Sequence, residues 1–313
     1  MRHPTDARIA KQGCLQVGYN ICMRYYGNVI RPPSEARSYI LQVTYGCSHN
    51  RCTFCGTYLD KPFRVRPVNE VFEDIAMARE EIPDLRRVFL ADGDALVLST
   101  QKLVAILDAL NANFPKLERV GIYANARDLL RKSEQDLALL RSKGLGIVYI
   151  GLESGSDEVL LHVKKGVSAT EMVQAVQRAK TAGIASSVIA LLGIAGPEGS
   201  AEHAQATGKI VSRMDPEYLA LLTLMLVPGT ELYHQYSEGT FELMDAYAML
   251  HELRLVLQNL EGLTHCVFRT NHASNYLPLA GTLPQDKERL ISAIDGALQE
   301  GPAVFRPESW RRL

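Results

Sequence analysis

Three cysteines in C-x4-C-x2-C spacing lie in the stretch Tyr45-Gly-Cys-Ser-His-Asn-Arg-Cys-Thr-Phe-Cys-Gly-Thr57. They follow an apolar run, Tyr39-Ile-Leu-Gln-Val-Thr44, which predicts a buried strand because it is short, β-branched and aromatic and stops at a turn-forming Tyr-Gly. A structural zinc site and an ordinary ferredoxin-type cluster each use four protein ligands. Three thiolates on one loop therefore indicate a metal centre with one position left open for a substrate or cofactor.

Two plainer interpretations of these three cysteines compete with the open metal centre. The loop could form a zinc knot with His49 or a distant histidine as fourth ligand, or the thiols could be free and close together by chance. Zinc loops rarely follow the first strand of a repeated strand–helix pattern, which favours the open centre. The remaining cysteines are interpreted as packing residues: Cys14, Cys22 and Cys266.

The composition is that of an ordinary globular protein. With 313 residues, 47% of them hydrophobic and 22% charged, the chain can form one large α/β domain or two domains. A net charge of -1 gives no overall basic field, so nucleic acid is not an expected partner. No apolar run reaches the roughly 20 residues that span a bilayer. The start, Met1-Arg-His-Pro-Thr-Asp, lacks the apolar core of a signal peptide, so we expect a cytoplasmic location and no membrane partner.

A strand followed by a helix recurs roughly every 30 to 50 residues. Apolar runs predict strands at 39–44, 87–91, 119–123, 146–150, 186–192 and 218–227. Helices are predicted at about 68–81, from Ser99 onward, from Ser133 to Gly144, and at about 200–214. Another helix is predicted after the fourth strand; it is broken at Gly166 and restarts at the capping box Ser168-Ala-Thr-Glu171. This order predicts parallel strands with right-handed crossovers.

Polar and glycine residues follow nearly every one of these strands. In barrels of parallel strands the site lies at the carboxyl ends of the strands, whereas an open doubly wound sheet uses one switch point. Candidates after most strands therefore favour an α/β fold with a partial (β/α)6 TIM-like barrel, open on one side.

We expect three parts along the chain. Residues 1–37 form an N-terminal extension, with a helix between Ala7 and Arg24, and residues 38–232 form the barrel. Residues 233–313 form a smaller α+β extension that caps the barrel. Within it we expect a helix at about 243–259, a strand at 264–269, a polar segment at 269–276 that could act as a lid, and a final helix from Pro284 to about Glu300.

At this point the chain resembles the radical S-adenosylmethionine (SAM) enzymes over roughly residues 38–233. The resemblance rests on the cysteine loop with Phe54 before its last cysteine, on Asp92-Gly93-Asp94 after the second strand, and on Glu153 after the fourth. The family's usual spacing has one residue fewer between the first two cysteines, and the longer spacing occurs in minority branches. The run Leu226-Val-Pro-Gly-Thr-Glu-Leu-Tyr233 is similar to the sixth-strand ending of the branch with coproporphyrinogen dehydrogenase-like and methylthiotransferase enzymes. The tail from Cys266 to Lys287 resembles that of an uncharacterised bacterial subgroup.

The resemblance implies a [4Fe-4S] cluster held by Cys47, Cys52 and Cys55, with SAM on the fourth iron. The reduced cluster would cleave SAM to a 5′-deoxyadenosyl radical that abstracts a hydrogen atom from a substrate. The implied contacts to SAM come from the strand ends: Phe54, Asp92, Gly93, Asp94, Asn125, Arg127, Glu153, Ser154, Gly193 and Gly196. Asp92 to Asp94 would face the SAM ammonium, Glu153 with Ser154 the ribose, and Gly193 to Gly196 with Phe54 the adenine.

Each of these residues also has a plainer interpretation. Asp92 and Asp94 could form a solvated turn, and Glu153, Ser154 and Asp157 could simply start a helix. Asn125 and Arg127 could cap a helix instead of contacting SAM. Surface positions are favoured for a further set of polar residues: His272, Asn275, Tyr276 and the pair Lys164-Lys165.

The sequence leaves the reaction open. The expected function is reductive SAM cleavage followed by hydrogen abstraction from a small-molecule or peptide substrate, with an electron donor such as flavodoxin or ferredoxin. One alternative is transfer of a 3-amino-3-carboxypropyl group from SAM, and another is a non-catalytic zinc- or iron-binding module. No residue is assigned a catalytic part beyond cofactor binding.

Overall fold

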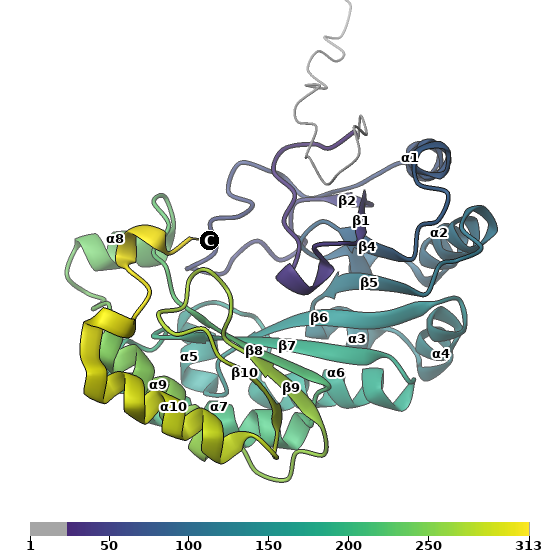
Figure 1. Cartoon of the computed structure of the whole chain (residues 1–313). Coiled ribbons are helices and arrows are strands. Elements are labelled where there is room, and N and C mark those ends of the chain that lie inside the picture. Colours follow the sequence, from purple (N-terminus) through teal and green to yellow (C-terminus); the bar gives the residue numbers. More distant parts are fainter. Residues whose placement is uncertain (1–23, 313) are drawn as a thin grey trace, which may run out of the picture.

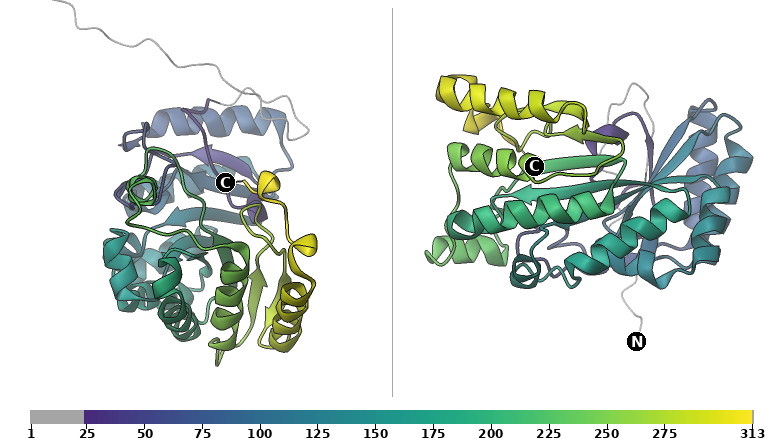
Figure 2. Two further views of the ribbon diagram at one scale, coloured as in Figure 1. Left: turned by 90° about the vertical axis from the view of Figure 1, so that its left-hand side faces the viewer. Right: turned by 90° about the horizontal axis from the view of Figure 1, so that it is seen from below.

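The protein forms one curved sheet with helices on its outer side (Figure 1, Figure 2). Its structure is a computed structural model that describes residues 24–312. The strands of the main sheet are β1 (Tyr39–Gln42), β4 (Arg87–Ala91), β5 (Arg119–Ala124), β6 (Leu145–Glu153), β7 (Ala185–Leu192), β8 (Tyr218–Thr223), β9 (Cys266–Arg269) and β10 (Ala280–Leu283). A separate small ribbon consists of β2 (Thr44–Tyr45) and β3 (Arg64–Val65).

The strand order confirms the predicted fold class. Neighbours follow the order β1-β4-β5-β6-β7-β8-β9-β10, and all pairs are parallel except β9 with β10. In the described part of the chain β1 and β10 are sheet edges, so the barrel is partial. The helices are α1 (Val68–Glu81), α2 (Thr100–Asn113), α3 (Ala126–Arg131), α4 (Glu134–Ser142), α5 (Asp157–His162), α6 (Ala169–Thr181), α7 (Gly196–Met214), α8 (Glu231–Ser237), α9 (Ala246–Gln258) and α10 (Lys287–Glu300).

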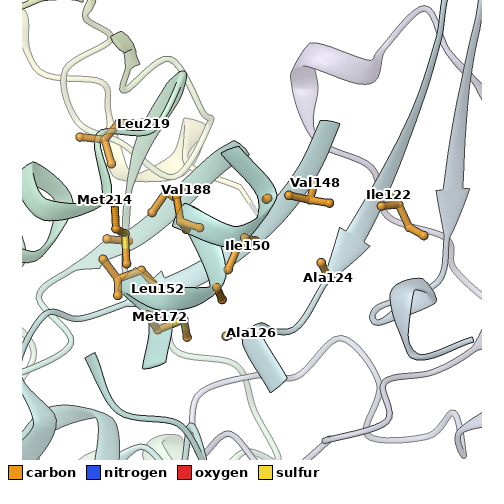
Figure 3. Close-up of a cluster of buried hydrophobic side chains, with 14 of the residues drawn as sticks. Ile122, Ala124, Ala126, Val148, Ile150, Leu152, Met172, Val188, Met214 and Leu219 are labelled. Atoms are coloured by element: carbon orange, nitrogen blue, oxygen red, sulfur yellow. The ribbon is translucent and has the colours of Figure 1, made fainter. Parts of the chain in front are cut away.

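Alternation along the strands separates two layers of buried side chains. Outward-facing residues such as Val148 and Ile150 pack with Met172 of α6 in the main core (Figure 3). The residues that alternate with them, Ile147 and Tyr149, point into the barrel and belong to a smaller, more aromatic cluster. The sheet therefore builds its core on the helix side and leaves its concave side for other purposes.

Helix starts follow the predicted caps. Ser133 and Ser168 each form a complete capping box, with Asp136 and Glu171 respectively, and Ser99 accepts from the Lys102 amide. These side chains satisfy amide groups that have no partner in the first turn. The short helix α3 was not predicted, because its few residues carry too little periodicity to register.

Three predicted boundaries are wrong. Strand β8 ends at Thr223 and not at residue 227, because the chain leaves the sheet and Val227 packs against Gly56 of the cysteine loop. The final helix begins at Lys287 and not at Pro284, since residues up to 283 belong to β10 and the Asp286 carboxylate accepts from the Thr282 amide. Helix α7 begins at Gly196, four residues before the predicted start at 200.

The C-terminal strands continue the barrel sheet. Strand β9 pairs with β8, and helix α9 packs against α7. The division into three parts at residues 37 and 232 stays a prediction. The helix expected between Ala7 and Arg24, together with Cys14 and Cys22, lies outside the described residues. No helix within residues 24–312 is both long and apolar enough to cross a membrane.

Asn275 ties the polar segment to the end of β8. Its Oδ1 accepts from the Thr223 amide at 2.8 Å, and its Nδ2 donates to the Leu221 and Thr270 carbonyls at 2.8 and 2.9 Å. The side chain is 2% exposed, so the expected surface position is wrong for this residue. Tyr276, by contrast, is only half-buried and donates to Glu308 at 2.8 Å.

We predict that Asn275→Ala lowers the free energy of unfolding by about 2–4 kcal/mol, because it leaves buried backbone groups without partners. Asn271→Ala, an exposed position in the same segment, should change it by less than about 0.5 kcal/mol. Urea unfolding of both variants measures the difference, and equal effects would contradict the part given to Asn275.

Candidate active site

The cysteine loop begins with a turn that only glycine fits well. Gly46 has φ of 69°, and a Cβ there would lie 2.4 Å from the Lys61 carbonyl oxygen. This close approach turns the chain away from β1 and carries the three cysteines across the carboxyl ends of the strands.

Asp92 binds the start of this loop. Its Oδ2 accepts from the Gly46 amide at 3.2 Å, from Lys61 Nζ at 2.9 Å and from Gln42 Nε2 at 3.2 Å. The carboxylate is 0% exposed, and its Oδ1 has no partner within the described residues. The solvated-turn interpretation is therefore wrong for Asp92. An unpartnered oxygen on a buried carboxylate leaves an acceptor for a donor from a ligand.

Asp94 binds the loop a little further on. One carboxylate oxygen accepts from the Ser48 hydroxyl, and the other accepts from the Asn125 amide at 3.2 Å. Burial, followed by the nearby Asp128 carboxylate, raises the pKa of Asp94 to about 7. Asn125 itself caps α3 by accepting from the Arg127 amide at 3.1 Å, so the capping interpretation holds for its side chain.

The far side of the loop is held by backbone contacts. The Thr53 amide donates to the Val163 carbonyl at 3.1 Å, and the Thr53 carbonyl accepts from the Leu232 amide at 2.9 Å. His49 Nε2 lies 2.7 Å from the Lys164 carbonyl oxygen, so this nitrogen donates. Of the two ring nitrogens, only Nδ1 is therefore left to bind a metal ion.

The three thiols share a half-buried position on this loop. Burial raises the pKa of Cys47, and the charges of Asp94 and Cys55 add to the rise. Burial also raises the pKa of Cys52 to about 11, with Lys165 opposing and the charges of Glu153, Cys55 and Cys47 adding to the rise. The thiols are therefore near one another and would release protons on binding metal.

The donor set of the loop, three thiols, is the kind that holds an iron–sulfur cluster. Among residues 24–312, no three His, Cys, Asp or Glu side chains are arranged to hold one metal ion. A single zinc needs every sulfur about 2.3 Å from one point, whereas the thiolates of an iron–sulfur cluster bind different irons. Three thiols on one loop can supply the thiolates for three different irons.

Glu153 forms a buried ion pair with Lys165. Lys165 Nζ lies 2.7 Å from Glu153 Oε1, and each side chain is 11% exposed. Glu153 has φ of 63° and follows a register shift in the pairing of β6 with β7. A non-glycine residue in the left-handed region is uncommon, and here it coincides with the register shift at the end of β6. The expected surface position is correct for Lys164, 54% exposed in its side chain, and wrong for Lys165.

The two proposed neighbours of an adenine lie in one cluster. Phe54 packs against a group of buried residues that includes Ile194, inside the Gly193–Gly196 turn. Gly193 has φ of 81°, and a Cβ there would lie 2.2 Å from the Met249 methyl carbon. Met249 therefore occupies the space beside Gly193. A Cβ on Gly196 would lie no closer than 3.5 Å to a neighbouring atom. Gly93 has the Tyr58 ring at 2.4 Å from its own Cβ position.

Ser154 and Asp157 have structural partners. The Ser154 hydroxyl lies 2.7 Å from His203 Nδ1 and accepts from the Ser156 amide at 3.0 Å. Ser154 is 0% exposed, so its hydroxyl points away from the barrel mouth and toward α7. Asp157 begins α5 and accepts from the Ala169 amide at 2.7 Å, as the helix-start interpretation expects.

Glu252 of α9 fixes the glycine turn from outside the predicted barrel. Its Oε1 accepts from the Gly193 amide at 2.7 Å, and its other oxygen accepts from the Ser200 hydroxyl. Burial raises the pKa of Glu252 to about 7. Burial lowers the pKa of the neighbouring His203 to about 4, so the ring is neutral at neutral pH and the 3.6 Å approach of the two is not an ion pair.

A cavity of about 340 Å³ opens into the concave side of the barrel. Its wall includes Tyr123, Tyr149 and Ile189 from three neighbouring strands and His272 from the polar segment. His272 therefore lines the cavity, and its Nδ1 lies 2.9 Å from the Ser274 hydroxyl oxygen.

Sequence reasoning missed the two lysines that pair with the site carboxylates. Lys61 lies in the loop after the cysteines and Lys165 follows α5, and each reaches its partner through the fold. The only local signal is that Lys165 lies between a helix end and Gly166, where the chain turns back toward the sheet.

We predict that Lys165→Met lowers the free energy of unfolding by about 3–5 kcal/mol, because it leaves the Glu153 charge buried without a partner. Lys164→Met, which removes an exposed pair with Glu231, should cost less than about 1 kcal/mol. Urea unfolding of the metal-free variants gives both values. Similar losses in the two variants would contradict a buried pair at Glu153.

We predict that Glu252→Gln changes how stability depends on pH. A carboxyl with a raised pKa binds more protons in the folded state, so its contribution falls as pH rises from about 4.5 to about 7. Relative to the parent, the variant should therefore gain about 1–3 kcal/mol between pH 5 and 7.5 in urea unfolding. The lowered pKa of His203 makes the free energy of unfolding rise with pH in both proteins, so this contribution cancels in the difference between variant and parent. Glu261→Gln, at an exposed position, serves as the control. If the difference in free energy of unfolding between Glu252→Gln and the parent is the same at pH 5 and pH 7.5, the raised pKa of Glu252 is contradicted.

Comparison with known proteins agrees with this geometry. Residues 41–203, just over half of the chain, match the radical SAM superfamily. An uncharacterized methyltransferase of Pyrococcus horikoshii is 24% identical over 201 residues, which is 62% of this chain and 41% of the relative. The heme chaperone HemW of Bacillus subtilis is 22% identical over 226 residues, which is 69% of this chain and 58% of HemW.

A solved structure shows the same fold. Coproporphyrinogen III oxidase (HemN) from Escherichia coli, a radical SAM enzyme, superposes with a TM-score of 0.54 at 16% identity, covering 73% of this chain and 53% of that one. This chain thus spans less than two thirds of the length of each relative named here. The chain belongs to the radical SAM superfamily and is an enzyme whose cofactors are a [4Fe-4S] cluster and SAM.

Proposed function

We propose that this enzyme cleaves SAM reductively and uses the product to remove a hydrogen atom from a substrate held inside the barrel. The proposal is carried by one observation: a loop with three neighbouring thiols is bound to the strand ends by Asp92 and Asp94, beside the Glu153–Lys165 pair. When bound, the cluster and SAM supply a 5′-deoxyadenosyl radical for hydrogen abstraction.

The chain's own residues bind and orient these groups. Cys47, Cys52 and Cys55 would hold three irons and leave the fourth for SAM. The free Oδ1 of Asp92 is a buried acceptor suited to an ammonium group. Half-buried Arg127 makes no ion pair within the described residues, and its charge is suited to a carboxylate.

The nucleoside part of SAM would lie further round the mouth of the barrel. Glu153 can accept from the ribose hydroxyls with the oxygen that Lys165 does not bind. Phe54 and the Ile194–Gly196 part of the glycine turn would flank the adenine. Ser154 and Gly193 support these residues from the helix side, through His203 and Met249.

We infer the class of substrate and the partners from the site. The cavity in the barrel suits a small molecule or the end of a peptide, and the polar segment with His272 would help to exclude water from it. An electron must come from outside the chain, and a flavodoxin or ferredoxin is the proposed donor. Free thiols are kept reduced in the cytosol, where we place the protein.

The superfamily membership supports an enzyme over the alternative of a non-catalytic metal module. Transfer of a 3-amino-3-carboxypropyl group differs from the proposal in its nucleoside product. Anaerobic incubation with dithionite and SAM, followed by chromatography, should give 5′-deoxyadenosine. A product consisting of 5′-methylthioadenosine would favour the transfer reaction.

We predict that Cys→Ala at position 47, 52 or 55 reduces 5′-deoxyadenosine formation at least about 100-fold, because each thiolate holds one iron. Cys266→Ala, at a buried cysteine of β9 outside the loop, is the matched control and should retain activity. Turnover that survives the loss of any of the three loop thiols would refute the assignment.

A further inference from the structure

The cavity in the barrel carries an excess of positive charge. Four arginines contribute to its wall: Arg31, Arg87, Arg119 and Arg269. No aspartate or glutamate of residues 24–312 lines it. The Glu35 carboxylate lies behind the wall and pairs with Arg119 at 2.5 Å. In the described structure the other three arginines form no ion pair.

Two of these arginines stand side by side. Arg87 and Arg119 are the first residues of β4 and β5 and are paired in register. Like charges at directly opposed positions of neighbouring strands destabilise a sheet. One carboxylate, Glu35, offsets only one of the two, and the Arg119 Nε is buried without an acceptor. This arrangement is stabilised when an anion occupies the cavity.

The remaining wall is apolar or aromatic. Ile147, Ile189 and Leu222 project into the cavity, together with Tyr149 and Tyr218. Such a wall with a few polar groups is typical of a site for a small organic ligand, and about 340 Å³ lies within the usual range for one.

The upper part of the cavity approaches the proposed ribose site. Gly151 of β6 pairs in register with Ile189 of β7, which lines the cavity. A Cβ on Gly151 would lie 2.1 Å from Glu153 Oε1, so the Glu153 carboxylate folds back over Gly151 into the barrel. The paired arginines lie at the opposite, amino-terminal ends of the strands.

We propose that the substrate is a small organic anion, a carboxylate or phosphate ester with an apolar or aromatic body. Its anionic group binds Arg87 and Arg119, with Arg31 and Arg269 adding charge, and its body extends along the tyrosines toward Glu153. This inference rests on the proposed function for its statement that the ligand is a substrate, while the binding of the anion does not depend on it.

The charge of the wall decides against other ligand classes. A cationic ligand would add to the positive charge of the wall, and a neutral one would leave the arginines, which are half-buried apart from the exposed Arg87, without an acceptor. A folded macromolecule does not enter a space of this volume. The anion is thus the ligand whose charge complements that of the wall.

The test uses four probes of one shape and different charge: 3-phenylpropanoate, 2-phenylethyl phosphate, 3-phenylpropanol and 3-phenylpropylamine. Each is titrated by calorimetry into the full-length chain, isolated anaerobically and kept without reductant or SAM. At least one of the anions should bind at least about tenfold more tightly than the alcohol and the amine. The ratio between the two anions distinguishes a carboxylate from a phosphate ester as the natural group.

The double variant Arg87→Gln/Arg269→Gln should weaken binding of the preferred anion at least about tenfold. The matched control Arg79→Gln/Arg86→Gln removes two exposed arginines outside the cavity and should leave binding unchanged. Three results would overturn the proposal: equal binding of the alcohol, equal effects of the two double variants, or no binding of either anion at 10 mM.

The outcome is separable from that of the proposed function. Probe binding requires neither an electron donor nor SAM, whereas formation of 5′-deoxyadenosine requires both. Anion binding without SAM cleavage would reject the proposed reaction and keep the anion site. SAM cleavage without anion binding would keep the proposed reaction and reject the anion site.

Discussion

The site depends on two buried carboxylates that bind the cysteine loop to the end of β4. Asp92 accepts from the Gly46 amide and Asp94 from the Ser48 hydroxyl, so the first cysteine lies between two fixed points. Burying these charges is unfavourable unless they are paired, and Lys61 supplies the partner for Asp92. The end of β4 thereby sets the position of the first part of the loop.

The same strands serve two purposes because side chains alternate across the sheet. Outward residues such as Ile150 make the core with the helices, and inward residues such as Tyr149 shape the cavity. The register shift near Glu153 turns that carboxylate toward the barrel mouth while Leu152 remains in the core. A rigid core on one side thus holds the reactive groups on the other side in place.

Much of this arrangement could be predicted from the chain. The strand positions, the capping boxes at Ser133 and Ser168, and the gathering of polar residues at the strand ends follow from local periodicity and cap chemistry. Lys61, Lys165 and Glu252 could not be predicted, because their partners are distant in the sequence and only the folded chain brings them together. Asn275 was misplaced for the same reason, since a polar residue in a polar segment gives no local sign of burial.

The central claim is that the loop supplies three thiolates and leaves one iron for SAM. Mössbauer spectroscopy of protein reconstituted with 57Fe tests it most directly, because the spectrum of each iron reports its ligands. With one iron left for SAM, addition of SAM should shift the signal of one iron in four and leave the other three unchanged. A spectrum in which all irons respond alike, or in which a single mononuclear site accounts for the iron, would contradict it.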